Sequence, residues 1–394
     1  MTIQLEAWSE QVVELTSDQA SAVARSELAR VLVDVPPDRW RLVTDSRIGV
    51  VRTDDFDLRV SPKLAIPQLM FLLSYAADPR GWRDVGPTFA AEDDLFTAVA
   101  SAFAVHAERA LAPAPIRGYV RVEDRSTTLR GTLRMGDQIA RWPAQPIPLE
   151  IAYDDFTADV PENRLVRGAA GLLLRMPLLP FRVRRRLLRV RGLLEDVTPT
   201  SPAASVRAPT ITRLNARYCS VLALAELILR GASISTRAGA ITGVSFVFDM
   251  NTVFEDFLSS TLKTAIERHG GRLDLQFGRE HLDLQRTIRL IPDLTWWKDG
   301  ACRAVLDAKY KQLTDQRFPN ADAYQMLAYC TALGLHRGYL VYAKDAGASD
   351  RDHTIKDAGK VIHVRAIDVE KPPAHVLADV EKLADAVVGA SSTL

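Results

Sequence analysis

Residues 288–313, IRLIPDLTWWKDGACRAVLDAKYKQL, constrain the fold more than any other part of the chain because they have the pattern of a β-hairpin. Two apolar runs rich in β-branched residues, 288–297 and 302–310, flank the sequence Lys298-Asp299-Gly300. An Asp-Gly pair between two such runs is a strong short-range signal for a tight hairpin turn. We therefore predict two antiparallel strands in this segment.

Polar side chains occupy positions of this hairpin where apolar ones are expected. Asp307 and Lys309 are two residues apart, so they share one face of the second strand. With the turn near Gly300, Asp293 on the first strand lies about opposite Asp307. Hard cations such as Mg²⁺ take carboxylates, waters and phosphate oxygens as ligands. The pattern predicts a divalent-cation site held by Asp293, Asp307 and the backbone carbonyl of Ala308.

The chemistry expected of this site is hydrolysis of a phosphodiester bond in nucleic acid. A bound cation polarises the phosphodiester and activates a water, while Lys309 holds that water or offsets charge in the transition state. The competing interpretation is that Asp307 and Lys309 form an ion pair on a solvated face. The apolar neighbours in the sequence AVLDAKY favour a strand that is buried on at least one face, where an unpaired carboxylate implies a use.

Composition sets the broad class of protein. The chain has 394 residues, of which 47% are hydrophobic and 25% charged, as expected of a soluble globular protein of two or three domains. The net charge of +1 neither indicates nor excludes a nucleic-acid partner, so any such surface must be local. Cys219, Cys302 and Cys330 lie among apolar residues, which favours buried thiols in a reducing compartment over a zinc site. Without a signal sequence or a long apolar run, the chain is expected to be cytoplasmic and not membrane-inserted.

The N-terminal part, residues 1–205, is predicted to be an α+β region that binds a partner. Strand-like alternation marks residues 40–63, interpreted as a three-stranded meander, and residues 117–153. Helical spacing marks residues 66–111 and 161–194. A stretch rich in Pro, Ser, Thr and Ala, residues 198–210, is the best linker candidate before the second domain at 206–394.

Arginines are concentrated in two stretches of the N-terminal part. The first, residues 117–135, is either a solvated β-ribbon or a contact to phosphate or to a partner, and the second, residues 181–194, is a basic amphipathic helix that lies in solvent, on an acidic partner or on DNA. The arginines concerned are Arg117, Arg121, Arg125, Arg130 and Arg134 in the first stretch, and Arg182, Arg184, Arg185, Arg186, Arg189 and Arg191 in the second.

The C-terminal part alternates helices with strands. This order predicts an α/β domain with a mixed central sheet covered by helices. The predicted helices are 214–230, one that begins near residue 251 and ends at 270–271, 321–333 and one at the C-terminus; the predicted strands are 273–277, the hairpin, 338–344 and 361–368.

These residues resemble the PD-(D/E)XK nuclease superfamily. Pro292-Asp293 and Asp307-Ala308-Lys309 match its signature, a helix that carries Glu255 precedes them, and Gln325-x-x-x-Tyr329 follows as in the RecB-like branch. The resemblance implies a restriction-endonuclease-like fold. It assigns Asp293 and Asp307 as metal ligands and Lys309 as the catalytic lysine. It also implies that Glu255 is a further acid and that Gln325 and Tyr329 position DNA or the scissile phosphate.

The whole chain is similar to the McrC family, the nuclease subunits of McrBC modification-dependent restriction systems. The similarity lies in residues 58–76, 117–135, 151–169 and 248–258 together with the nuclease signature. It implies a partner, a McrB-like AAA+ GTPase that recognises modified cytosine and whose GTPase the N-terminal part stimulates. Because the chain has no G-x-x-x-x-G-K-S/T phosphate loop, GTP is expected to bind the partner and not this chain.

Three hypotheses follow from the sequence. The first is a Mg²⁺-dependent DNA endonuclease subunit of a McrBC-like system, in which Mn²⁺ can substitute and methylated double-stranded DNA is cut. The second is a catalytically degenerate adaptor that regulates an AAA+ GTPase, against which the intact set of Asp293, Asp307 and Lys309 argues. The third is a stand-alone nuclease of the same fold that acts on RNA or on unmodified DNA.

Overall fold

The computed structural model describes residues 2–34, 38–52, 56–77, 79, 95–143, 145–176, 179–200, 208–237, 245–310, 319–343 and 350–391. Residues 201–207 of the predicted linker and residues 311–313 of the predicted hairpin lie outside the described residues.

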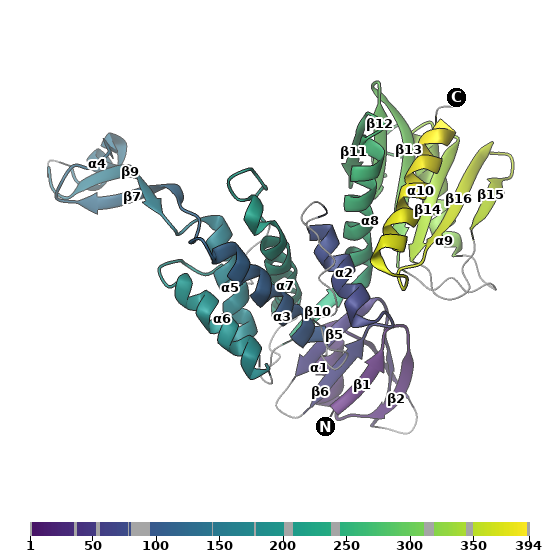
Figure 1. Cartoon of the computed structure of the whole chain (residues 1–394), viewed down its shortest axis with the longest axis horizontal. Helices are drawn as coiled ribbons and strands as arrows, with labels where there is room; N and C mark the ends of the chain where they lie inside the picture. The colour runs from purple at the N-terminus through teal and green to yellow at the C-terminus, as the bar shows by residue number, and fades with distance from the viewer. Residues whose placement is uncertain are drawn as a thin grey trace. The chain divides into compact units, whose positions relative to one another are not determined.

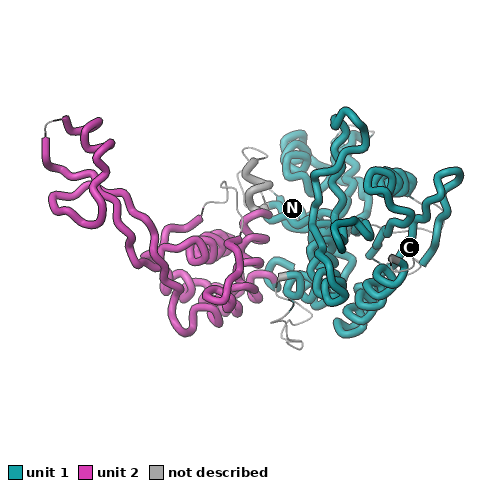
Figure 2. Tube along the Cα trace, turned by 90° about the horizontal axis from the view of Figure 1, so that it is seen from above, with its two compact units in different colours: residues 1–98, 238–394 teal, residues 99–237 magenta. Residues whose placement is uncertain are grey.

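The chain divides into two compact units, shown in different colours in Figure 2. Unit 1 contains residues 1–98 and 238–394, and unit 2 contains residues 99–237. The boundary predicted between residues 205 and 206 does not coincide with this division. The first 98 residues share a unit with the C-terminal part because they pair with it in one β-sheet.

Within the described residues, six strands of unit 1 form a mixed sheet in the order β11-β12-β13-β14-β16-β15. The three central strands β13, β14 and β16 run parallel, and the outer pairs are antiparallel. The mixed sheet predicted from the sequence is confirmed, although β15 was not among the predicted strands. The bounds are β11 (Arg272–Leu275), β12 (Leu294–Lys298), β13 (Ala301–Lys309), β14 (Arg337–Ala343), β15 (Arg351–Ile355) and β16 (Lys360–Ile367).

Helices cover both faces of this sheet. Helices α8 (Met250–Glu267) and α10 (Pro373–Ser391) pack against each other and against β13, and Figure 1 shows them on one face of the sheet. Helix α9 (Asn320–Ala332) packs on β14 and β16 through a buried cluster that includes Met326 and Leu340. The domain is therefore a three-layer α/β/α arrangement, which fixes the ends of the central strands.

The predicted hairpin is present, and its turn has the expected chemistry. Strands β12 and β13 pair antiparallel with Leu294 opposite Leu306, and Asp299 and Gly300 between them have φ angles of 53° and 76°. Two successive residues with positive φ are the requirement of a type I′ turn, which Asp-Gly meets at low cost. The first strand is shorter than predicted, since it begins at Leu294 and leaves Asp293 just before it.

Two further sheets lie in the N-terminal part of unit 1. The sheet order β1-β6-β5-β10 joins β1 (Thr2–Glu6), β6 (Asp57–Ser61) and β5 (Arg47–Arg52) to β10 (Ser245–Asp249). The predicted meander is wrong in its pairing, because β4 (Arg39–Val43) pairs with β2 (Glu10–Glu14) and β3 (Arg30–Val33) in a separate sheet. The chain bends at Ser46 between β4 and β5, and the alternation of apolar and polar residues continues on both sides, so it did not reveal the change of sheet.

Strand β10 leads directly into helix α8. Asp249 caps the helix by accepting a hydrogen bond from the backbone N–H of Asn251 at 2.9 Å. The hydroxyl of Ser46 donates to the same carboxylate at 2.9 Å. Helix α2 (Ile66–Ala77) packs along α8, with the rings of Phe71 and Phe257 edge-on at 5.3 Å between centroids. Helix α8 is thus held from both halves of the sequence.

Unit 2 is mainly helical with one small sheet. Helix α5 packs between α6 and α7, and in its core the hydroxyl of Tyr218 donates to the Asn163 side chain at 3.0 Å. Helix α3 runs across the boundary between the units. The helices of unit 2 are α3 (Leu95–Leu111), α4 (Met135–Arg141), α5 (Pro161–Arg175), α6 (Phe181–Leu193) and α7 (Cys219–Arg237). Its strands are β7 (Gly118–Ser126), β8 (Thr132–Leu133) and β9 (Leu149–Thr157).

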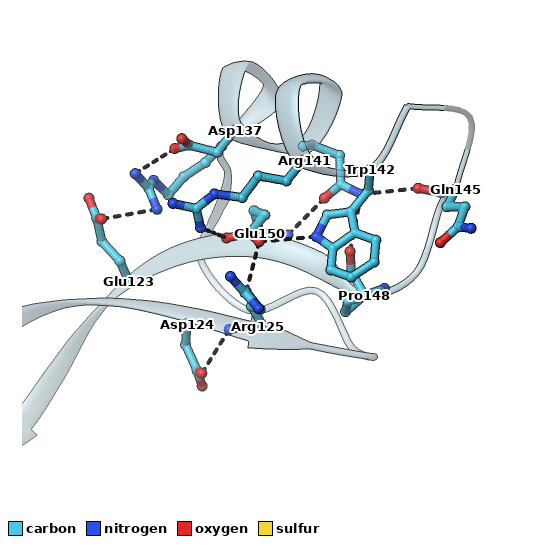
Figure 3. Close-up of polar contacts among 11 residues, drawn as sticks. Glu123, Asp124, Arg125, Asp137, Arg141, Trp142, Gln145, Pro148 and Glu150 are labelled. Atoms are coloured by element: carbon cyan, nitrogen blue, oxygen red, sulfur yellow. Dashed lines mark hydrogen bonds and ion pairs between the residues drawn. The ribbon is translucent and has the colours of Figure 1, made fainter.

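Several of the arginines in residues 117–141 bind acidic side chains of the same unit, as Figure 3 shows around Glu150. The buried Glu150 carboxylate pairs with Arg125 at 2.9 Å and with Arg141 at 3.2 Å, and it accepts a hydrogen bond from the Trp142 ring at 3.1 Å. Burial raises the pKa of Glu150, but these partners lower it by more. These pairs favour the ribbon interpretation for Arg125.

The basic helix α6 is partly neutralised within unit 2. Arg189 pairs with Glu108 at 2.8 Å and Arg186 with the same carboxylate at 3.8 Å, while Arg184 donates to backbone carbonyls. The apolar face of the helix is buried through residues that include Val183 and Leu187. Three of the arginines predicted as a cationic face therefore have partners in the chain.

Cys330 is buried, whereas Cys219 and Cys302 are only half-buried, which corrects the prediction of three buried thiols. Burial raises the pKa of Cys302 to about 12 and that of Cys330 to about 11, so neither is a thiolate at neutral pH. In the described part of the chain, no helix combines the length and apolar character needed to cross a membrane.

Candidate active site

The predicted acidic pair lies at the open end of the hairpin, away from its turn, where β12 begins and β13 ends. Asp293 precedes β12, and its carboxylate accepts a hydrogen bond from the backbone N–H of Ala308 at 2.9 Å. The pairing of Leu294 with Leu306 carries on to place Asp293 beside Asp307. The register that the hairpin imposes is thus the reason why residues 14 positions apart meet.

Asp307 is a buried carboxylate with few hydrogen-bond donors among the described residues. Its side chain is 1% exposed, and Lys309 Nζ lies 2.5 Å from Oδ2. Across the described ranges, neither oxygen accepts a hydrogen bond of regular geometry. The interpretation of Asp307 and Lys309 as an ion pair on a solvated face does not fit this burial. A buried carboxylate that lacks donors is normally explained by a strained or functional role.

The electrostatics of the cluster disfavour negative charge on its acids. Burial raises the pKa of Asp293, and the Glu255 carboxylate raises it further. Burial likewise raises the pKa of Asp307, with Asp293 as the next cause. Burial lowers the pKa of Lys309, but the nearby carboxylates, Asp307 first, together raise it by more, so the lysine stays protonated. The site therefore carries clustered acids and one cation, an arrangement that an additional cation would stabilise.

Glu255 joins this cluster from helix α8. Burial raises its pKa, and both Asp307 and Lys309 act on it electrostatically. Its carboxylate accepts a hydrogen bond from the side chain of Gln276 at 3.2 Å. Gln276 was not predicted from the sequence. Its side chain and backbone hold two site residues at once, since its N–H donates to the carbonyl of Asp293 at 2.8 Å.

Gln325 and Tyr329 lie one turn apart on α9 and contact each other. The Gln325 amide donates to the Tyr329 hydroxyl at 2.7 Å, and that hydroxyl donates to the carbonyl of Ile291 at 3.0 Å. Burial, followed by the charge of Asp307, raises the pKa of Tyr329 to about 12. The tyrosine thus stays neutral and holds the backbone two residues before Asp293. Direct contact of either residue with DNA stays a prediction.

Two residues that sequence reasoning missed support the same strand end. Asp322, in the first turn of α9, is buried, accepts a hydrogen bond from Tyr342 at 2.8 Å and helps to raise the pKa of Lys309. Asn251 accepts from the backbone N–H of Tyr310 at 3.2 Å and donates to Ser46 at 2.7 Å. An acid in a first helical turn is usually a dipole effect, so Asp322 gave no distinct signal.

The donor set fits a hard cation with an incomplete protein shell. Among the described residues, no group of three or more His, Cys, Asp or Glu side chains is arranged to hold a metal ion. Mg²⁺ commonly takes only one or two carboxylates and completes its shell with water and phosphate oxygens. The buried Asp307 oxygens without hydrogen bonds and the adjacent Asp293 match that requirement. Ligation by the Ala308 carbonyl stays a prediction.

Comparison with known proteins decides the family. A family model described as a McrBC 5-methylcytosine restriction system component matches residues 42–343. The chain belongs to this family. The match includes most of each predicted domain as well as Asp293, Asp307 and Lys309, and it confirms the family that the sequence motifs indicated. A comparison with curated protein sequences gives no match.

Two solved structures are similar to this member of the McrBC family. One is a refined half-complex from the tetradecameric assembly of Thermococcus gammatolerans McrB AAA+ hexamers with bound McrC; the matched chain is 17% identical, with a TM-score of 0.57 over 98% of this chain and 100% of that chain. The other is the cryo-EM structure of the Thermococcus gammatolerans McrBC complex, at 20% identity and a TM-score of 0.40 over 67% of this chain and 88% of that chain. The first likeness shows a shared fold along almost the whole length.

Proposed function

We propose that this chain is the nuclease subunit of a McrBC-type, GTP-dependent restriction system that cuts DNA carrying modified cytosine. The observation that carries the proposal is the cluster of a buried Asp307 with the half-buried Asp293 and Lys309 at the end of β13, joined by Glu255 from α8. Family membership supports the system, and the PD-(D/E)XK signature supports the chemistry. Without a phosphate loop of its own, this chain takes its GTP dependence from a McrB-like AAA+ partner, whose GTPase it stimulates.

Each residue of the cluster has a distinct role in this proposal. Asp293 and Asp307 would hold Mg²⁺, for which Mn²⁺ could substitute, and a cation held there would supply polarisation of the phosphodiester and a more acidic water. Lys309 keeps its proton beside the reacting phosphate and offsets the charge that develops there. Tyr329 fixes the backbone ahead of Asp293 through the carbonyl of Ile291.

The test combines the purified chain with its McrB-like partner, GTP, Mg²⁺ and a methylated duplex. Wild type should cut the duplex, and Asp307→Ala should not, while the partner's GTPase should still respond to the variant. A variant that cuts like wild type would remove the cluster from the mechanism. GTP hydrolysis without any cutting by wild type would instead favour the adaptor function.

A further inference from the structure

The segment between β11 and β12, residues 276–291, forms a braced loop next to the candidate site; we call it the β11–β12 loop. The backbone N–H of Leu290 donates to the carbonyl of Glu280 at 3.0 Å, and that of Leu282 donates to the carbonyl of Ile288 at 2.9 Å. These bonds connect the two sides of the loop as in a hairpin. The loop therefore projects as a defined element.

The tip of the loop is fixed by one carboxylate. Asp283 accepts hydrogen bonds from the backbone N–H of Thr287 at 3.0 Å, from its hydroxyl at 2.6 Å, and from the N–H of Ile288 at 2.8 Å. The bonds from Thr287 and Ile288 lower the pKa of Asp283 to about 2. Its negative charge is thus directed into the turn and not toward an incoming partner.

Both ends of the loop are bonded to residues of the candidate site. At the start, Gln276 donates from its backbone to the carbonyl of Asp293 and from its side chain to Glu255. At the end, the carbonyl of Ile291 accepts from Tyr329. Anything that binds the tip is consequently held at a set distance from the acidic cluster.

The outer surface of the loop combines apolar and cationic side chains. Leu284 at the tip is 97% exposed, although the backbone around it is ordered by hydrogen bonds. Single exposed hydrophobics are common, but a group of them in one short segment marks a contact surface. The exposed apolar residues of this segment are Leu282, Leu284, Ile288 and Ile291, and its exposed arginines are Arg279, Arg286 and Arg289.

We propose that the β11–β12 loop contacts the DNA substrate, with Leu284 inserted at a base step in the minor groove and Arg279 and Arg286 on the flanking phosphates. The inference rests on the proposed function, since it takes DNA as the substrate. Leucine is one of the apolar wedges that unstack base steps, and arginines bind phosphates irrespective of sequence. Leu284 and Asp293 are nine positions apart in the sequence and so at most ~30 Å apart in space, less than one helical turn of DNA at ~34 Å. A duplex at the acidic cluster therefore passes within reach of the tip.

The charges favour DNA over a second copy of the chain. In a two-fold dimer built on this loop, the arginines around one tip would meet the same arginines of the partner copy, and like charges in close contact oppose association. The acidic group at the tip, Asp283, is already satisfied by Thr287 and Ile288 and offers no compensating pair. A DNA duplex, by contrast, offers phosphates to the arginines and a base step to the apolar tip.

The experiment measures binding of the full-length chain to a labelled duplex at low salt, with Ca²⁺ in place of Mg²⁺ to prevent cutting. Leu284→Ala should weaken binding roughly tenfold and abolish the fluorescence rise of 2-aminopurine placed in the duplex, which reports unstacking. Arg286→Ala should weaken binding and reduce the slope of log affinity against log salt by about 1. Val33→Ala, at a position 77% exposed on β3, and Lys356→Ala, at the exposed β15–β16 turn, are the matched controls and should bind like wild type.

The outcomes separate this inference from the proposed function. Loop variants that bind and unstack DNA like wild type, or a wild type that binds no DNA, overturn the loop assignment even where Asp307→Ala abolishes cutting. Weakened binding by the loop variants supports the assignment even where wild type and partner fail to cut methylated DNA. A dimer that Leu284→Ala converts to monomer in sedimentation, with DNA affinity unchanged, would show that the loop contacts a second copy instead.

Discussion

The hydroxyl of Tyr329 on α9 donates to the carbonyl of Ile291, 3.0 Å away, and thereby fixes the backbone that presents Asp293. A side chain from one layer of the domain thus sets the position of a carboxylate that lies at the edge of another layer. The Tyr329 side chain is only 3% exposed, so the hydroxyl end of this bond is largely shielded from water.

Tyr329→Phe should reduce cleavage by about tenfold, because removal of the hydroxyl leaves the Ile291 carbonyl unpaired and loosens Asp293 at a cost of about 1–2 kcal/mol. The measurement is the single-turnover cutting rate with saturating partner and GTP. Raised Mg²⁺ should recover part of the rate if the defect lies in ligand placement. Tyr324→Phe, on the same helix and 69% exposed, is the control; an equal loss in both variants would contradict a positioning role.

Metal binding should be detectable without any cutting. Mg²⁺ at ten times its Kd should stabilise the wild-type chain by about 1.4 kcal/mol, seen as a rise in Tm, because it binds the folded cluster alone. Asp307→Asn should show no such rise and should lose cutting by about 10³-fold. Asp379→Asn, which removes a half-buried α10 carboxylate paired with Lys371 and Lys382, should respond to Mg²⁺ like wild type. A rise of equal size with Asp307→Asn would exclude that residue as a ligand.

Local signals made the hairpin and its carboxylates predictable. The Asp299-Gly300 turn sets the register, and the register carries Asp293 to Asp307 without further information. Apolar periodicity is also a local signal, and it predicts the helices and most strands of the C-terminal part. Strand β15 was missed because its sequence, RDHTI, is mostly polar and lacks a clear alternation.

Contacts between distant parts of the sequence could not be predicted in this way. Strand β10 pairs with β5 across about two hundred residues, which places Ser46 beside the cap of α8 and changes the domain boundary. Gln276 was predicted to lie in a strand at 273–277, but β11 ends at Leu275, and the alternation there gave no indication of the bonds from Gln276 to Glu255 and Asp293. Such pairings depend on tertiary packing and not on local propensity.

Acid should weaken unit 2 through Asp159. Its carboxylate accepts two bonds from Arg164, at 2.8 and 2.9 Å, and two from Thr198, and the bond from Arg164 is the first cause that lowers its pKa to about 2. A lowered pKa in the folded state means that the stabilisation is complete above pH about 4 and is lost as pH falls toward 2. Asp159→Asn should lower the free energy of unfolding by about 1–2 kcal/mol at pH 7 and by less at pH 2. Urea titrations at both pH values test this, and an equal difference at the two values would contradict it.

The β5–β10 pairing that unites the two ends of the chain should depend on Gly49. This residue has a φ of 147°, and a Cβ there would overlap the backbone carbonyl of Phe246 on the neighbouring strand. Gly49→Ala should therefore destabilise unit 1 by about 3 kcal/mol or more, through strain and a displaced strand ahead of α8. Gly389→Ala is the control, because a Cβ at this position of α10 meets no atom within 4 Å and should be neutral or slightly stabilising. Urea denaturation of the full chain measures both; an unchanged midpoint for Gly49→Ala would mean that the strand pairing tolerates a shift, and that α8 is held mainly by α2.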